Sequence, residues 1–309
     1  AGGVDIQSGK PRSRSAQDLV ELIPEVRTVA TVEYEDYCRI GSSRMTPELQ
    51  SGLSKKVNEV LAIEDVSGVV VTHGTDSLEE SAFFLELTVN SEKPVVFAAA
   101  QRPPTRSDTD GPRNLLNAIR IAGSERARGR GVMVTLNDEI HSGKYVRKTH
   151  TISLESFKSG QKGMIGYVDN GQVLFFTRPE PRIVFPPDKI DSKVDLIKLV
   201  AGSDAKFVEA AIEKGSSGLI VEAFGRGNIP PAVFDALLRA RERGLMVVIA
   251  SRCFEGRVVI PDEWRAKGLV CAQDLDSLKA RILLMICLGL KKDIQETQRL
   301  FDEVSLVST

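Results

Sequence analysis

The sequence is poor in cysteine and histidine and has no long apolar run. Its four cysteines include no Cys-x-x-Cys pair, and its three histidines show no His-x-x-x-His spacing. This pattern favours free thiols over a disulfide framework or a metal site. The longest apolar run, Ile282 to Leu290, has nine residues, whereas a membrane-spanning helix needs about 20. We therefore expect no metal and no membrane segment.

An excess of charge of either sign is also absent. The chain of 309 residues carries 41 Lys and Arg against 42 Asp and Glu, for a formal net charge of −1. No run of five basic residues occurs, which argues against binding nucleic acid through bulk charge. There is no basic and apolar leader and no Gly-x-Ser-x-Gly string. The four unpaired cysteines favour a cytoplasmic protein.

Short apolar runs alternate with segments of helical spacing in the first half of the chain. We expect strands at 29–33, 69–72, 94–100 and 131–136, and helices at 77–89 and 111–122. This alternation indicates a parallel sheet flanked by crossover helices. Asn170-Gly171 within 163–177 predicts a hairpin, which would add antiparallel strands at one edge of that sheet.

A proline-rich stretch separates two parts of the chain. Four prolines fall within 178–191, a composition typical of an extended linker. Alternation then resumes, with strands expected at 196–200, 218–222 and 246–250, and helices at 204–214, 230–243, 276–290 and 293–304. The predicted fold is α/β. A larger N-terminal domain, 1–180, has a parallel sheet with a mixed edge, a linker covers 181–194, and a smaller C-terminal domain, 195–309, has a parallel sheet.

The turn from Thr72 to Ser77 connects a predicted buried strand to a predicted helix. In parallel α/β sheets ligands bind at this edge, where helix N-termini offer free N–H groups. Asp76 and Ser77 could simply cap the helix. The alternative is a binding site, because Gly74 allows close approach and Asp76 could bind an ammonium group. Thr75 would then supply a hydroxyl beside a small amino-acid substrate.

A hydroxyl needs a proton acceptor to act in catalysis, and a nearby lysine can supply one. Lys144 and Lys148 both follow the strand at 131–136 and should reach the same edge of the sheet. Spacing alone does not choose between them, and either could be a surface lysine. Ser42 and Ser43 follow Gly41 and could bind a carboxylate or shape a turn.

Several segments together resemble the bacterial L-asparaginases. They are His73-Gly74-Thr75-Asp76 with the helix to residue 85, and segments 93–96, 110–115, 137–141, 146–151, 225–228 and 251–253. The resemblance extends from about Ser15 to Phe301. It implies hydrolysis of L-asparagine to L-aspartate and ammonia through a threonine acyl-enzyme, with L-glutamine as a second substrate in some members. It implies no metal or organic cofactor.

The resemblance also assigns roles to individual residues. It makes Thr75, Asp76 and Lys148 catalytic, with Asp76 also binding the substrate's α-amino group. Ser42 falls where the family binds the α-carboxylate. Ser43 falls where many members have glutamine, so both serines are substrate-binding candidates. Family members are usually homotetramers in which the neighbour's smaller domain closes each site, and we expect the same assembly here.

One family feature is missing from this chain. The family's N-terminal T-G-G-T-I turn, which carries the usual nucleophile, occurs nowhere in the 309 residues. One alignment sets Ala1 to Val4 on that turn and puts valine at the nucleophile. We prefer another, in which the first three residues are the far end of an active-site loop, and a polar loop at 5–15 is expected before the first periodic segment. The first strand and its threonine are then expected upstream of Ala1.

Two other functions compete with an active asparaginase. The absent nucleophile motif favours a catalytically silent homologue that binds aspartate or asparagine as a sensor or scaffold. The amidase subunit of a tRNA-dependent amidotransferase shares the core motifs. Such a subunit would require a basic RNA-binding face or a further domain, and neither the charge nor the length of this chain indicates one.

Overall fold

A computed structural model describes residues 2–4, 11–13, 15–178 and 180–305. The chain divides into two compact units, Ala1–Asp188 and Lys189–Thr309. The predicted linker at 181–194 includes the point of division. In the described part of the chain, no helix has the length and apolar character needed to cross a membrane.

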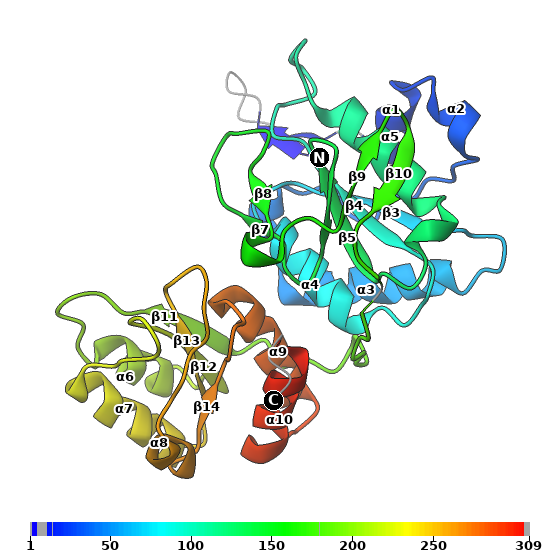
Figure 1. The fold of residues 1–309 in the computed structure, drawn as a ribbon. Helices are drawn as coiled ribbons and strands as arrows, with labels where there is room; N and C mark the ends of the chain where they lie inside the picture. The colour runs from blue at the N-terminus through cyan, green and yellow to red at the C-terminus, as the bar shows by residue number, and fades with distance from the viewer. Residues whose placement is uncertain (1, 5–10, 14, 179, 306–309) are drawn as a thin grey trace. The chain divides into compact units, whose positions relative to one another are not determined.

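Unit 1 is built on a six-stranded sheet with the order β10-β9-β6-β5-β4-β3 (Figure 1). Strands β3 (Val69–Thr72), β4 (Val95–Ala98) and β5 (Val132–Leu136) are parallel. Strands β6 (Glu139–Ser142), β9 (Gly166–Asp169) and β10 (Gln172–Phe175) extend it antiparallel. The predicted parallel sheet with a mixed edge is thus confirmed, including the hairpin at Asn170-Gly171.

Helices cover both faces of this sheet, so its central strands are buried on both sides. On one face Val96 and Ala98 of β4 pack in a core with Leu115 and Ile119 of α5 (Gly111–Ala122). Beside α5 lie α1 (Ala16–Glu21) and α2 (Val26–Val29). The other face is covered by α4 (Leu78–Thr88), against which α3 (Pro47–Leu61) packs. Full burial explains why the strands read as unbroken apolar runs.

Two expectations for the N-terminal region are wrong. Val29 ends α2, and 30–33 forms no strand. The apolar and polar residues alternate there as in a half-buried strand, but no described strand pairs with the segment, and Thr31 and Glu33 are exposed. Within the expected polar loop at 5–15, β2 (Pro11–Ser13) pairs antiparallel with β1 (Gly2–Val4). Residues 5–10 and 14 of that loop lie outside the described residues.

A separate two-stranded sheet follows β6. Strand β7 (Arg147–Lys148) pairs antiparallel with β8 (Phe157–Lys158), with Lys148 opposite Phe157 and Arg147 opposite Lys158. Before it, the tight turn between β5 and β6 places Asn137 and Asp138 at positive φ values of 50° and 65°, a conformation that these two residue types tolerate best among non-glycine residues. Short 3-10 helices η1 (Ser42–Arg44), η2 (Glu125–Ala127) and η3 (Gly160–Lys162) complete the unit.

Unit 2 has a parallel sheet with the order β11-β12-β13-β14, as expected. The strands are β11 (Val194–Lys198), β12 (Gly218–Ala223), β13 (Met246–Ser251) and β14 (Leu269–Cys271). Its helices are α6 (Lys206–Glu213), α7 (Pro231–Glu242), α8 (Asp262–Ala266), α9 (Ser277–Gly289) and α10 (Ile294–Val304). Within this unit α6 and α7 lie over one face of the sheet, and α9 and α10 over the other (Figure 1).

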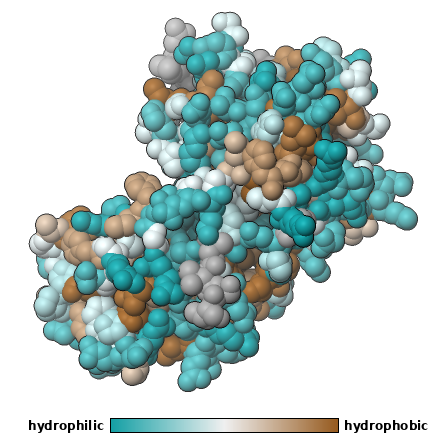
Figure 2. All heavy atoms as spheres, in the orientation of Figure 1, coloured by the Kyte–Doolittle hydropathy of each residue, from teal (hydrophilic) through white to brown (hydrophobic). Residues whose placement is uncertain are grey.

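The drawn face of the molecule is mostly hydrophilic (Figure 2). On the face drawn in Figure 2, hydrophilic residues predominate in each unit, and hydrophobic residues appear in small groups among the hydrophilic ones. Large hydrophobic side chains that are exposed include Phe207 and Phe254 of unit 2.

Candidate active site

The candidate site is the turn between β3 and α4. Strand β3 ends at Thr72 and α4 begins at Leu78, so residues 73–77 lie at the carboxyl edge of the sheet. Ser77 is the N-cap residue, but its side chain makes no capping bond. Its hydroxyl instead donates a hydrogen bond to the carbonyl of Ser42 at 2.6 Å. Simple helix capping therefore does not account for this turn.

Lys148 is the lysine that reaches the turn. Its Nζ donates to Thr75 Oγ1 at 2.8 Å and lies 3.0 Å from Asp76 Oδ1. The Lys148 side chain is 18% exposed, whereas that of Asp76 is 62% exposed. Lys144, the other lysine of this segment, instead places its Nζ over the Tyr145 ring, 5.3 Å from the centroid. The structure thus unites Thr75, Asp76 and Lys148 and leaves Lys144 out.

Ser42 joins the same site from η1. The Asp76 N–H donates to Ser42 Oγ at 3.1 Å, and Ser42 is buried. A Cβ on Gly74 would lie 2.5 Å from Ser42 Oγ, closer than atoms pack, so the close approach of η1 to the turn requires glycine. Ser43 lies on the same 3-10 helix but is exposed. Among the described residues it makes no hydrogen bond with Thr75, Asp76 or Lys148.

His73 is the first residue of the same turn, and its side chain is buried. Its Nδ1 lies 2.7 Å from the Gly74 carbonyl oxygen, and its Nε2 lies 3.1 Å from Ser81 Oγ. A carbonyl only accepts, so Nδ1 carries the hydrogen and Nε2 accepts from the Ser81 hydroxyl. Burial lowers the pKa of His73, which keeps the ring neutral. These bonds suit His73 to orienting the turn.

Glu79 is a site residue that the sequence interpretation missed. Its Oε2 accepts a hydrogen bond from the Lys148 backbone N–H at 2.7 Å. Glu79 lies in the first turn of α4, so it connects the start of this helix directly to β7. Glu79 and Lys148 are 69 positions apart in the chain, so no local pattern in the sequence indicated this contact.

No group of three or more His, Cys, Asp or Glu residues suited to a metal ion occurs in the described ranges. The site instead combines a hydroxyl, an amine and a carboxylate at the ligand-binding edge of a parallel sheet. A hydroxyl held against a lysine is the arrangement by which enzymes activate a weak nucleophile or pass a proton. The fold is α/β, and the site has the groups that an enzyme of this architecture uses to transfer a proton between a hydroxyl and a lysine.

Comparisons with known proteins indicate the family to which this chain is similar. Residues 3–181 match the family described as Asparaginase, N-terminal, and residues 193–301 match the Glutaminase/Asparaginase C-terminal domain. L-asparaginase 2 of Bacillus subtilis is 36% identical over 293 residues, covering 93% of this chain and 78% of the relative. Glutaminase-asparaginase of Pseudomonas fluorescens is 35% identical over 303 residues, covering 93% and 82%.

A solved structure agrees with the sequence relatives. The crystal structure of a probable cytoplasmic L-asparaginase from Campylobacter jejuni superposes with a TM-score of 0.88 and 36% sequence identity. The match covers 93% of each chain. The present chain belongs to the asparaginase family, and the family resemblance drawn from its motifs is confirmed.

Proposed function

We propose that this protein is an L-asparagine amidohydrolase, which converts L-asparagine to L-aspartate and ammonia. The family membership and the relatives named L-asparaginase support this reaction. The observation that carries the proposal is the 2.8 Å contact between Lys148 Nζ and Thr75 Oγ1. One of the relatives is named a glutaminase-asparaginase, so L-glutamine is proposed as a second, slower substrate.

The charges of the site fit an amino-acid substrate. The exposed carboxylate of Asp76 can pair with the substrate's α-ammonium group. Ser42 Oγ accepts the Asp76 N–H, which leaves its own O–H to donate to the α-carboxylate. Ser43 adds a second hydroxyl on the same 3-10 helix. The N-terminus of α4 supplies further positive potential for the carboxylate.

The chemistry requires one proton to move twice. A threonine hydroxyl attacks the side-chain amide carbon and gives its proton to the Thr75 hydroxyl, while the Thr75 proton passes to Lys148 acting as a neutral amine. That proton returns to the amide nitrogen as the C–N bond breaks and ammonia leaves. Water then hydrolyses the ester to L-aspartate. The family pattern puts the attacking threonine in a T-G-G-T-I turn, which these 309 residues lack. The proposal for this chain therefore concerns proton transfer at Thr75.

Ammonia release tests the proposal. A purified full-length preparation is supplied with L-asparagine, L-glutamine or D-asparagine, and ammonia is measured against time. We expect fastest release from L-asparagine. The competing function, a silent homologue that binds aspartate or asparagine, predicts calorimetric binding of L-aspartate and no release from any substrate.

Assembly, location and domain limits are further parts of the proposal. From the family resemblance we propose a homotetramer, testable by light scattering of the purified protein. We propose a cytoplasmic location, supported by the structural neighbour from Campylobacter jejuni, which is described as a probable cytoplasmic L-asparaginase. A relative from Haemophilus influenzae is named a probable periplasmic asparaginase, so cell fractionation decides. Limited proteolysis within 181–194 tests the linker between the domains at 1–180 and 195–309.

A further inference from the structure

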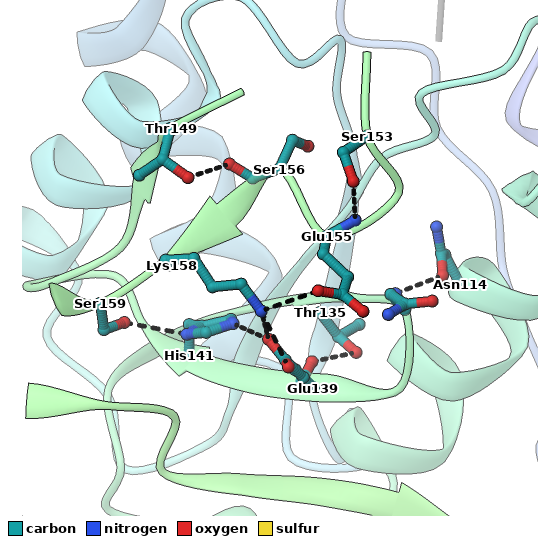
Figure 3. Close-up of polar contacts among 11 residues, drawn as sticks. Asn114, Thr135, Glu139, His141, Thr149, Ser153, Glu155, Ser156, Lys158 and Ser159 are labelled. Atoms are coloured by element: carbon teal, nitrogen blue, oxygen red, sulfur yellow. Dashed lines mark hydrogen bonds and ion pairs between the residues drawn. The ribbon is translucent and has the colours of Figure 1, made fainter. Parts of the chain in front are cut away.

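A polar cluster of Glu139, His141, Lys158 and Ser159 lies beside the small β7–β8 sheet (Figure 3). Its centre is Glu139, the first residue of β6. Lys158 Nζ donates to both carboxylate oxygens of Glu139 at 3.1 Å. Glu139 Oε2 also lies 3.0 Å from His141 Nε2, and His141 Nδ1 lies 2.9 Å from Ser159 Oγ. Glu139 therefore holds Lys158 directly and the next residue, Ser159, through His141.

The arrangement resembles a serine–histidine–carboxylate triad, but burial excludes that role. His141 is 2% exposed and Ser159 is 6% exposed, so no substrate carbonyl can reach the serine hydroxyl. Burial also lowers the pKa of His141, and a neutral ring suits a connecting role. The cluster instead fixes the position of strand β8, because it binds Lys158 of that strand and Ser159 directly after it.

Strand β8 in turn holds the strand that carries Lys148. In the described part of the chain, β7 pairs with β8 alone. Lys148 lies opposite Phe157, and Arg147 lies opposite Lys158. Successive residues of a strand point to opposite faces. The small sheet thus presents Lys148 to Thr75 on one face and Lys158 to Glu139 on the other.

We propose that Glu139 is a positioning residue for Lys148: by fixing Lys158 and Ser159 it sets the strand on which the Lys148 amine meets Thr75. This inference rests on the proposed function for its kinetic consequence only. The Asp76 backbone and the Ser42 side chain are held together within the β3–α4 turn and η1, through a contact that does not involve β8. Loss of Glu139 should therefore reduce the rate of proton transfer and leave substrate binding intact.

The matched variants are Glu139→Gln and Glu155→Gln. Both remove a carboxylate near the same lysine, but Glu155 lies 3.8 Å from Lys158 Nζ and its side chain is 64% exposed. We expect Glu139→Gln to lower kcat for L-asparagine about tenfold with KM changed less than twofold, and Glu155→Gln to leave both unchanged. Equal kcat in Glu139→Gln and the wild type would overturn the proposal.

A double-mutant cycle separates positioning from general destabilisation. If Glu139 acts through Lys148, then Glu139→Gln has no further effect on the residual kcat of Lys148→Met. Multiplying effects would show a merely structural role and would contradict the proposal.

Hydrogen exchange tests the same link without using activity. We expect Glu139→Gln, but not Glu155→Gln, to speed amide exchange at 147–149, while exchange in α4 stays unchanged. Faster exchange in a protein that releases no ammonia would support the positioning link while the proposed function failed. Unchanged exchange at 147–149 would refute the link whatever the activity.

Discussion

The amine of Lys148 lies 2.8 Å from the hydroxyl oxygen of Thr75, although 73 positions separate the two residues in the chain. The bond joins the short strand β7 to the turn before α4. A proton can pass across such a distance without a bridging water. This pair is therefore the part of the site on which the proposed chemistry depends.

Thr75→Val removes the hydroxyl and keeps the shape of the side chain. We expect kcat for L-asparagine to fall by about 10³ or more, because no proton can pass between the substrate and Lys148 at that position. Thr75→Ser keeps the hydroxyl and should retain activity within about tenfold of the wild type. Steady-state ammonia release measures both. Comparable kcat for the valine and serine variants would refute a role for the hydroxyl.

Ser42 and Ser43 should differ in their effect on binding. We expect Ser42→Ala to raise KM for L-asparagine about tenfold, because a hydrogen bond to a charged carboxylate contributes roughly 1.5–3 kcal/mol. Ser43 is exposed and is not held against the turn, so Ser43→Ala should raise KM less. Michaelis constants of the two variants test the difference. A larger effect at Ser43 would reverse the assignment.

Gly74 permits the close approach of η1. A Cβ there would lie 2.5 Å from Ser42 Oγ, whereas a Cβ on Gly41 has nothing nearer than Ser43 Oγ at 3.9 Å. Gly74→Ala should therefore push Ser42 from Asp76 and raise KM severalfold, with a lower melting temperature. Gly41→Ala, the matched control, should change neither. A Gly74→Ala variant with wild-type KM and melting temperature would contradict this account of the turn.

Glu86 makes stability depend on pH. It is buried in α4, accepts the Val132 N–H at 2.7 Å and lies 3.7 Å from Arg182. Burial raises its pKa from 4.5 to about 7. Between these values the folded protein binds the proton more tightly than the unfolded chain. This group's contribution to the free energy of unfolding therefore falls as pH rises through that window and levels off above about pH 7.

Glu86→Gln removes this dependence. The melting temperature of the variant minus that of the wild type should become more positive from pH 5 to pH 8, because only the wild type has to ionise a buried group. Glu92→Gln, which removes an exposed carboxylate, serves as the matched control. Calorimetry at the two pH values measures this, and a constant difference for Glu86→Gln would disprove the raised pKa.

The sequence predicted the strongly apolar elements at and beside the centre of the unit 1 sheet. The strand at 69–72, the helix at 77–89, the strand at 94–100 and the helix at 111–122 correspond to β3, α4, β4 and α5. Complete burial leaves unbroken apolar runs, which are easily recognised. The segment at 29–33 was misjudged because alternating apolar and polar residues indicate only that one face of the segment is apolar. It does not reveal whether a neighbouring strand exists to accept the hydrogen bonds.

The part of the site that is contiguous in the sequence was predicted, whereas some of the residues brought to it by distant contacts were not. His73 to Asp76 are contiguous, so the motif was visible in the sequence. The choice of Lys148 over Lys144 came from the family resemblance, because nothing local distinguishes the two lysines. The roles of Glu79 and Glu139 depend on contacts with β7 and β8, separated by 69 and 19 positions. Spacing along one chain carries no record of such contacts.

The most direct test of the central claim compares Lys148→Met with Lys144→Met by ammonia release from L-asparagine. Both variants remove one amine from the same short segment, and only Lys148 contacts Thr75. We predict that Lys148→Met lowers kcat by about 10³ while still binding L-aspartate, and that Lys144→Met keeps wild-type kcat. Wild-type kcat in Lys148→Met, or equal losses in the two variants, would contradict proton transfer between Lys148 and Thr75.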